Sequence, residues 1–485
     1  MRDAYRAADI RAAEEAFIAT LPDGTLMQRA ASGLARRSAL LLRDRFGGVA
    51  GRRVLLLVGA GNNGGDALFA GARLASRGAR VSAVFVKDPH VAGFAAFRAA
   101  GGVPELPGTA DLVIDGLLGT GAHGGLREPA AALVASIDDV DATDGGRPIV
   151  VAVDVPSGID VDTGAVPGVA VRADVTVTFG ALKPGLVVGP GAVRSGHVEV
   201  VDIGLVPWLR AEPLVRVPDN DDVGAWWPHP GPGDDKYTRG VVGLATGSGG
   251  YPGAAVLSVA GALAGPAGLV RYAGRAADAI RTRHPSVISV DTVADAGRVQ
   301  AWVCGSGLGT DAFALGELRA VLAADVPICL DADGLSLIAS HDLVHELGAR
   351  TKPTVVTPHD REFARLAGAG HGAGALGADR VGDALGLAAR LGITVLLKGD
   401  RTIVATPDGR AYANPTGTAD LATGGTGDVL AGLLGSLLAG GLAPERAALA
   451  AAYVHGLAGR RAAEAGPVTA TLVADALRAA VKVVH

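Results

Sequence analysis

Cysteine is almost absent from this chain: Cys304 and Cys329 are the only two among 485 residues. Each stands inside an apolar run, AWVCGSG and PICLDAD. Two isolated cysteines cannot supply the disulfide framework of a small secreted protein, so the sequence predicts buried free thiols and a reducing compartment.

Long hydrophobic runs and a strong net charge are also missing. No apolar run approaches the ~20 residues that cross a bilayer, and the opening residues MRDAYRAADIRAAEEAF lack the apolar core of a signal peptide. The formal charge is only −5, from 44 basic and 49 acidic residues, which gives no electrostatic reason to expect nucleic acid or an anionic membrane as partner. We therefore expect a cytoplasmic enzyme that acts on small molecules.

What the chain does contain is an alternation of short β-rich runs with helical stretches rich in alanine and leucine. This alternation predicts α/β domains built on parallel sheets, and 485 residues exceed the roughly 250–300 at which one core stops growing. The strands expected in the first half are 53–58, 79–86, 111–115, 149–154, 174–179 and 197–202. Those expected in the second half are 240–246, 300–304, 327–331, 354–357 and 393–398, with a hairpin of 402–405 and 411–414.

The segment AEPLVRVPDNDDVGAWWPHPGPGDDKY separates the halves and is rich in proline, glycine and acids without a sustained period. It predicts a linker. Trp226 and Trp227 could anchor a partner, but we favour their pinning the linker onto a neighbouring domain surface. We place the domains at 1–212 and 213–485, the second including the linker residues 213–237.

The first candidate site begins with the loop GAGNNGGD (Gly59–Asp66), whose glycines follow a predicted strand and satisfy the dinucleotide pattern G-x-G-x-x-G. Two asparagines and an aspartate crowd this loop where a Rossmann loop keeps small residues. Lys87 follows the next strand, where a dehydrogenase needs an acid. The loop therefore uses side chains as ligands, and a pyridine-nucleotide dehydrogenase is disfavoured.

Further polar groups follow later strands: Asp115 with the loop GTGAHGG (Gly119–Gly125), Asp154 and Ser157 in DVPSGID, and Lys183 in GALKPG. Carboxyl ends of parallel strands meet at one edge of a sheet, so these groups should converge with the acid of the first loop. Any one aspartate could be a helix cap or a turn residue. Together they indicate a pocket whose three carboxylates and one lysine favour a bound cation.

The strings LMQRAASGLA, GAGNNGGDA, DGLLGTG, VDVPSGID and FGALKPGL, in this order over residues 1–210, resemble the motifs of the NAD(P)H-hydrate epimerases. The resemblance implies a Rossmann-like domain and a potassium ion held by Asn63, Asp115 and Ser157. It also implies that the hydrated nicotinamide nucleotide contacts Asn62, Asn63, Gly64, Gly65, Asp66, Gly119, Thr120, Gly121, Ala122, His123, Gly124, Gly125 and Asp154.

The implied reaction inverts a hydroxyl-bearing carbon beside the ring nitrogen. An acid–base pair could assist departure of hydroxide and its return on the other face. Asp154 and Lys183 are the candidates, and Lys183 could instead serve only as a charge partner.

The second candidate site is the string TGGTGDVLAG (Thr423–Gly432) at the start of an apolar helix. Its glycines leave backbone N–H groups free at a helix N-terminus, which favours an anion such as phosphate. Asp428 follows directly and could face a hydroxyl beside the terminal phosphate, as in ribokinase-like kinases, although alone it could be an ordinary first-turn acid. Lys398 in LLKGDRT suits phosphate or adenosine contacts, and His359 alone could be a loop histidine.

With TGSGGYPGAAVL, CGSGLGT, DADGL and TPHDREF, these strings resemble the ADP- or ATP-dependent NAD(P)H-hydrate dehydratases, which are ribokinase-like, over residues 220–485. The family's GPGLG is GSGLG here, and its HPGE is HDRE, which adds two charges beside His359. The resemblance implies substrate contacts from Ala254, Gly307, His359 and Asp428. It implies adenine-nucleotide contacts from Lys398, Gly399, Asp400, Arg401, Thr402 and Gly427.

The implied chemistry is phosphorylation of the hydrate's hydroxyl with Asp428 as base, followed by expulsion of phosphate, with Mg²⁺ accompanying ADP or ATP. Both motif sets in one chain predict a bifunctional repair enzyme for hydrated NADH and NADPH, and we expect a homo-oligomer. A ribokinase-like small-molecule kinase with an accessory domain is the main alternative. A non-catalytic nucleotide-binding protein would not need two polar constellations.

Overall fold

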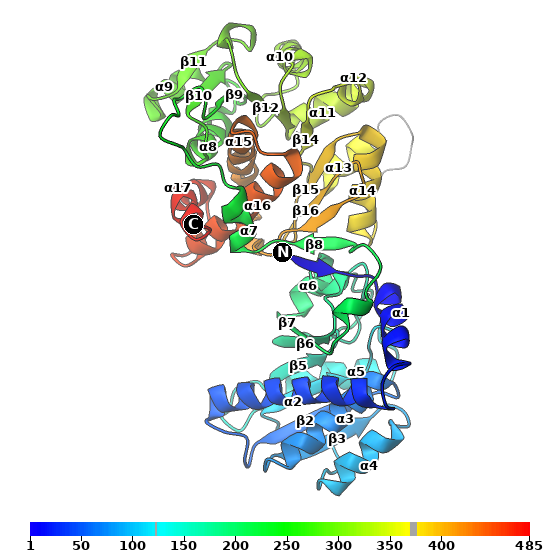
Figure 1. Ribbon diagram of the computed structural model, residues 1–485. Helices are drawn as coiled ribbons and strands as arrows, with labels where there is room; N and C mark the ends of the chain where they lie inside the picture. The colour runs from blue at the N-terminus through cyan, green and yellow to red at the C-terminus, as the bar shows by residue number, and fades with distance from the viewer. Residues whose placement is uncertain (122–123, 369–375) are drawn as a thin grey trace. The chain divides into compact units, whose positions relative to one another are not determined.

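A computed structural model describes residues 1–121, 124–368 and 376–485 of the chain. The chain divides into two compact units: Asp3–Val215 is the N-terminal unit, and Arg216–His485 with Met1–Arg2 is the C-terminal unit (Figure 1). Each unit is built of helices around a sheet of parallel or mostly parallel strands, so the predicted α/β class is confirmed. Every helix within the described residues is too short or too polar to cross a lipid bilayer.

The N-terminal unit holds a parallel sheet of six strands in the order β3-β2-β4-β5-β6-β7. Its strands are β2 (Arg53–Val58), β3 (Arg80–Phe85), β4 (Leu112–Gly116), β5 (Ile149–Val153), β6 (Val175–Phe179) and β7 (His197–Val201). Its helices are α1 (Ala7–Ile18), α2 (Thr25–Phe46), α3 (Asn62–Ala75), α4 (Val91–Ala99), α5 (Ala130–Ala135) and α6 (Gly189–Arg194).

Apolar side chains cover both faces of this sheet because its central strands are apolar throughout. Leu56 and Val58 of β2 pack with α1 to α4 in one core cluster. Leu55 and Leu57 point to the other face and pack with Val134 of α5. Alternate residues of a strand point to opposite faces, so β2 serves both clusters and the unit has three layers.

The order of this sheet creates a switch point between β2 and β4. The chain leaves β2 for β3 on one side and then returns to β4 on the other. The loops that follow β2 and β4 therefore diverge above the carboxyl ends of adjacent strands, which is where open α/β sheets bind ligands.

An eleven-stranded sheet in the order β1-β8-β17-β16-β15-β14-β13-β12-β9-β10-β11 lies in the described residues of the C-terminal unit, except that β1 and β8 include residues on both sides of the division between the units. Its strands are β1 (Arg2–Ala4), β8 (Val215–Val217), β9 (Val241–Ala245), β10 (Leu269–Ala273), β11 (Ile288–Val290), β12 (Ala301–Cys304), β13 (Ile328–Leu330), β14 (Thr354–Val356), β15 (Thr394–Leu397), β16 (Ile403–Ala405) and β17 (Ala411–Ala413). Strands β9 to β15 run parallel to one another, and β16 is antiparallel to both β15 and β17.

Helices of this unit pack on the sheet, with α15 beside α8 and α16 beside α17 (Figure 1). The helices are α7 (Asn220–Trp226), α8 (Pro252–Ala264), α9 (Ala277–Arg283), α10 (Ala312–Ala323), α11 (Asp333–Ser340), α12 (Val344–Gly348), α13 (Asp360–Gly368), α14 (Arg380–Leu391), α15 (Thr426–Ala439), α16 (Pro444–Ala463) and α17 (Ala470–Val481). Strands β10 and β11 follow β9 on one side of it, and the chain then returns to β12 on the other side. This change in strand order places a second switch point at the carboxyl edge of the sheet, between β9 and β12.

The segment predicted as a linker contains regular structure. Strand β8 lies inside it, and α7 begins with a capping box in which Asp219 accepts from the backbone N–H of Asp222. This sequence lacks a sustained period because α7 is only two turns long. Trp227 is 6% exposed and packs in the core of the C-terminal unit, with Trp226 partly buried beside it, so these tryptophans anchor the segment.

Both cysteines are free and fully buried. Cys304 ends β12 and Cys329 lies in the neighbouring strand β13. Burial raises the pKa of both thiols. The prediction of buried free thiols is confirmed.

Candidate active sites

The loops after β2 and β4 meet closely at the first switch point. A Cβ added to Gly59 would lie 1.9 Å from the carbonyl oxygen of Leu117, and one added to Gly64 would lie 2.1 Å from the carbonyl oxygen of Gly59. Backbone fills the space that a side chain would need. These glycines therefore bring the start of α3 against the loop after β4.

Asp154 and Lys183 form a buried ion pair beside this junction. Asp154 follows β5 with a φ of 67°, in the left-handed region that aspartate tolerates better than most residues. The Lys183 Nζ donates to Asp154 Oδ1 at 2.5 Å, to Thr178 Oγ1 at 2.9 Å and to the carbonyl oxygen of Phe179 at 2.9 Å. The Lys183 side chain is 1% exposed.

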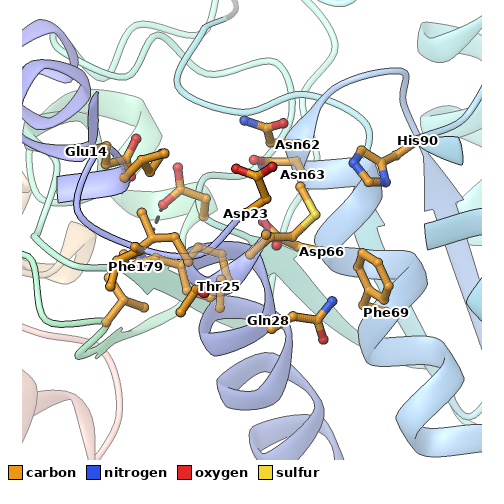
Figure 2. A pocket seen from close by; sticks show the side chains of 18 of the residues that line it. Glu14, Asp23, Thr25, Gln28, Asn62, Asn63, Asp66, Phe69, His90 and Phe179 are labelled. Carbon is orange, nitrogen blue, oxygen red and sulfur yellow. Dashed lines mark hydrogen bonds between the residues drawn. The ribbon is translucent and has the colours of Figure 1, made fainter. Parts of the chain in front are cut away.

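A cavity of about 560 Å³ opens over this pair, and Asp154 lines it. Glu14 of α1 and Asp66 of α3 also line it (Figure 2), so acids from separate elements surround the space. Burial raises the pKa of Asp66 well above its usual range, and the nearby carboxylates of Asp154 and Glu14 raise it further. Asp66 Oδ1 is buried and has no hydrogen-bond partner. This cavity can hold a polar ring and exchange protons with it.

A second cavity of about 680 Å³ adjoins the first and shares Glu14, Asn62, Asn63 and Thr120 with it. Its lining includes the glycine loop before α3 and three basic side chains, Arg11, Lys87 and Arg127. Helix N-termini and basic side chains favour phosphate. The two cavities together suit a ligand with a polar ring at one end and phosphates at the other.

Asn63, Asp115 and Ser157 come together near this junction. Asp115 is fully buried and accepts from the Ser157 backbone N–H at 2.8 Å and from Ser157 Oγ at 2.7 Å. The Asn63 Nδ2 donates to the carbonyl oxygens of Leu118 at 3.0 Å and Val153 at 2.6 Å. Burial raises the pKa of Asp115 to about 6 although these hydrogen bonds lower it. An all-oxygen set with a buried carboxylate fits a hard cation.

The other predicted residues of this site lie around the cavities or just beside them. Asn62, Thr120, Gly119, Gly121 and Gly125 line one or both cavities. Ala122 and His123 fall outside the described residues. Gly65 packs against Met27 and His90 at the first cavity, while Gly124 has a φ of 80° and open space around it.

The second site centres on Lys398, which follows β15. Its Nζ donates to Asp331 Oδ1 at 2.7 Å and lies 3.6 Å from Glu362 Oε2. Burial alone would lower the pKa of Lys398, but the two carboxylates outweigh burial and raise it. Asp331 also accepts from Ser306 Oγ at 3.1 Å and from Thr357 Oγ1 at 2.7 Å, so the ends of four strands converge here.

Asp428 lies in the first turn of α15 beside this network. Burial raises its pKa to about 7, the Asp331 carboxylate adds to the effect, and Lys398 and a hydrogen bond from Ser306 oppose it. A Cβ added to Gly427 would lie 3.5 Å from Lys398 Nζ. A carboxyl group whose pKa is raised to about 7 therefore adjoins both a lysine and the N-terminus of a helix, whose first N–H groups lack partners within the helix.

The glycines before this helix and after β12 adopt backbone conformations that other residues avoid. Gly425 caps α15 with a φ of 88°. Gly307 has a φ of 61°, and a Cβ there would lie 2.5 Å from the Cβ of Ala254. Two residues predicted to contact substrate, Gly307 and Ala254, are thus brought together.

The remaining predicted residues of the second site are held by their own neighbours. His359 Nδ1 accepts from the backbone N–H of Arg361 at 3.1 Å, and His359 Nε2 lies 3.4 Å from Glu362 Oε1. Asp360 pairs with Arg380 at 2.9 Å, so one of the two added charges is neutralised away from the histidine. The segment 399–402 forms a turn in which Thr402 Oγ1 donates to the carbonyl oxygen of Gly399 at 3.0 Å. Arg401 Nη1 donates to carbonyl oxygens after β17, Pro415 at 3.4 Å and Gly417 at 3.3 Å, and Asp400 Oδ2 lies 3.8 Å from that nitrogen.

Sequence reasoning missed Glu14 at the first site and Glu362 at the second as members of the charge networks. Glu14 carried a usable signal: the buried residues of α1 include Ile10, Ala13 and Phe17, and an acid stands beside that apolar stripe, where a helix of this kind expects an apolar residue. Glu362 stood in the string HDRE without a role.

Comparison with known proteins gives matches for both units. The family model described as YjeF-related protein N-terminus matches residues 23–185, and the one described as NAD(P)H-hydrate dehydratase matches residues 242–481. The chain is 49% identical over 417 residues to the bifunctional NAD(P)H-hydrate repair enzyme Nnr of Mycobacterium tuberculosis, covering 85% of this chain and 84% of that protein.

Two further matches concern one unit each. The NAD(P)H-hydrate epimerase of Clavibacter michiganensis is 46% identical over 231 residues, covering 44% of this chain and 95% of that protein. A ribokinase-like superfamily protein from Enterococcus faecalis of known crystal structure superposes with a TM-score of 0.50 at 26% identity, covering 56% of this chain and 96% of that one.

Proposed function

This chain belongs to the family of bifunctional NAD(P)H-hydrate repair enzymes, and from that premise we propose that it returns hydrated NADH and NADPH to their active forms in two steps. The N-terminal domain, residues 1–212, interconverts the R and S hydrates. The C-terminal domain, residues 213–485, dehydrates the S hydrate with an adenine nucleotide. A small-molecule kinase would leave the N-terminal unit without a task.

In the first step, Asp154 is the residue closest to the chemistry. Its Oδ1 accepts from Lys183, from Thr178 Oγ1 at 2.9 Å and from the backbone N–H of Phe179 at 3.3 Å. These donors hold the carboxylate in place and leave Oδ2 for the substrate. A fixed carboxylate in the cavity can stabilise the iminium ring that forms when hydroxide leaves.

A potassium ion fits beside this cavity, held by Asn63, Asp115 and Ser157. The ion would fix the loop after β4 and supply positive charge near the nucleotide. The support is the fully buried carboxylate of Asp115, whose pKa burial raises to about 6 and to which a nearby cation would restore its charge.

Removing that carboxylate tests the ion. In the wild-type protein, K⁺ added in place of Na⁺ should raise the melting temperature of the N-terminal unit, because a bound ion stabilises the folded state. Asp115→Asn should remove this response while retaining the shape of the side chain. An equal response to both ions in the wild type would contradict the site.

In the second step, Asp428 is the base. It takes the proton of the hydrate's hydroxyl as that oxygen attacks the terminal phosphate, and the N–H groups at the start of α15 stabilise the charge on the transferring group. The ring nitrogen then expels phosphate. The observation that carries this assignment is the place of Asp428 in the first turn of α15 beside Lys398 and Gly427, together with a pKa that burial raises to about 7.

Lys398 and the turn 399–402, with Gly427, hold the nucleotide, while Ala254, Gly307 and His359 contact the hydrate. No group of three acids, cysteines or histidines suited to a metal occurs within the described residues. Magnesium would therefore enter on the nucleotide phosphates, as it does in many phosphoryl-transfer sites.

Two variants, each assayed with both hydrates, test whether the two domains divide the reaction in this way. Purified protein receives the R or the S hydrate of NADH with ADP or ATP and Mg²⁺, and the return of the near-ultraviolet absorbance of NADH is followed. Asp428→Asn should lower the rate of dehydration of both hydrates about 100-fold or more and leave their interconversion intact. Asp154→Asn should slow only the R hydrate. If Asp154→Asn slows both equally, the two steps are not divided in this way.

A further inference from the structure

Lys183 has no proton free for the substrate. An ammonium group has three N–H donors, and those of Lys183 point to Asp154, Thr178 and the carbonyl oxygen of Phe179. With its side chain 1% exposed, Lys183 holds Asp154 in position and does not reach the cavity. The acid that protonates the departing oxygen must be another group.

The first cavity offers four other titratable side chains among its described lining: Glu14, Asp23, Asp66 and His90. His90 caps α4, where its Nδ1 accepts from the backbone N–H of Gly93 at 3.1 Å. Asp23 is exposed to solvent. Apart from Asp154, the carboxylic acids of the described lining that are at least partly buried are therefore Glu14 and Asp66.

Glu14 and Asp66 differ in their access to water. Asp66 is 6% exposed, whereas Glu14 is partly exposed and lies where the two cavities adjoin. Figure 2 shows both side chains at the pocket, one from α1 and the other from α3. An acid that gives up its proton in every turnover must be reloaded, and the partly exposed Glu14 is more accessible to solvent for this than Asp66 is.

Burial shifts Glu14 toward its protonated form. Burial raises the pKa of Glu14, Lys183 lowers it, Asp154 raises it again, and Arg11 one turn earlier in α1 lowers it slightly. Asp66 is the other acid within reach of Glu14. The groups that act on Glu14 are therefore the Asp154–Lys183 ion pair, Arg11 and the buried acid Asp66.

We propose that Glu14 is the general acid of the epimerase site, acting opposite Asp154. The inference rests on the proposed epimerase function. The C–O bond of the hydrate breaks, both electrons leave with the oxygen, and Glu14 gives that oxygen a proton, so that water departs. The lone pair of the ring nitrogen forms the C=N bond of the iminium.

The return step reverses this bond change on the other face. A water oxygen adds to the iminium carbon, the C=N electrons go back to nitrogen, and the released proton passes to the carboxylate of Asp154. One water leaves and one enters, so no other reactant is needed. Glu14 regains a proton from solvent and Asp154 loses one to it.

The experiment compares Glu14→Gln with Glu15→Gln, the exposed neighbour in the same helix. Glutamine keeps the size of the side chain but cannot donate a carboxylic proton. We expect Glu14→Gln to lower kcat for epimerisation about 100-fold, with KM changed less than about threefold and dehydration of the S hydrate unchanged. Glu15→Gln should match the wild type, and Glu14→Asp should retain an intermediate kcat.

The pH profile separates a catalytic from a structural role. In the wild type, kcat/KM for epimerisation should fall as pH rises through the pKa of the acid, and this limb should disappear in Glu14→Gln. A normal kcat, or a raised KM alone, in Glu14→Gln would overturn the inference while the epimerase function stands. Wild-type protein that does not exceed the spontaneous rate would overturn both.

Discussion

At the scale of single residues, the most informative group is Asp428, because we propose that its protonation state sets the dehydratase rate. Its pKa is raised to about 7, so protonation removes the base as pH falls below that value. We expect kcat/KM for dehydration to fall about tenfold per pH unit below about pH 7. Steady-state rates between pH 5 and 9 at saturating nucleotide measure this limb.

Asp331→Asn provides the control for that assignment. The Asp331 carboxylate raises the pKa of Asp428 and also holds Lys398. Loss of its charge should therefore move the acid limb to lower pH, provided that the melting temperature shows a folded variant. A limb that stays in place would mean that another group is titrating.

Lys183 should matter to the stability of the fold as well as to the site. Lys183→Met removes the partner of a buried carboxylate and should lower the free energy of unfolding of the N-terminal unit by about 3 kcal/mol or more. Urea denaturation of the full chain measures this loss. Adding Asp154→Asn should restore part of it, since the orphaned charge disappears.

A surface lysine gives the comparison for Lys183. Lys87 is exposed, and Lys87→Met should change stability by only about 0.5 kcal/mol. Equal losses from both lysine variants would show that the buried pair has no special role.

At the scale of elements, two glycines at the start of α15 have different roles: Gly425 allows the backbone turn that begins the helix, and Gly427 leaves space for the proposed phosphate contact. Gly425→Ala should destabilise the unit by about 1–2 kcal/mol, because φ is 88° and the added Cβ would lie 2.6 Å from Leu257 Cδ1. Gly427→Ala should leave the melting temperature nearly unchanged, since its Cβ makes no contact closer than 3.5 Å. It should weaken nucleotide binding about tenfold by occupying the phosphate position.

Calorimetric titration with ADP and thermal melting distinguish these two effects. Gly316→Ala in α10 is the matched control, because a Cβ there would meet nothing within 4 Å; it should raise stability slightly and leave ADP affinity unchanged. If Gly427→Ala binds ADP as the wild type does, the phosphates lie elsewhere.

Sequence patterns located most strands and the strand-end residues of both sites, because buried parallel strands are continuous apolar runs that end in polar loops. Strand β2 matches its predicted bounds. The missed strands β1, β8 and β11 are each three residues long. The missed strand β10 contains Arg271, which interrupts its apolar run. The structure accommodates this residue because its guanidinium donates to the carbonyl oxygen of Ala296. The position of Glu14 beside the apolar stripe of α1 marks it as unusual, but what it lies against depends on how α1 packs, which the local pattern does not show.

At the scale of the whole molecule, each half carries its own core, and we expect each to fold alone. Residues 1–212 should interconvert the hydrates, and residues 213–485 should dehydrate only the S form. Circular dichroism, melting curves and the two assays on the separate pieces check this. A folded first piece without epimerase activity would contradict the division of labour.

The burial of Cys304 and Cys329 also makes the native chain inert toward maleimide reagents. A single cysteine introduced on the surface of each half could then carry a donor and an acceptor dye, with no need to remove the natural thiols. Energy transfer between the dyes would report any change in the distance between the two labels during turnover, in a protein whose own thiols contribute no background.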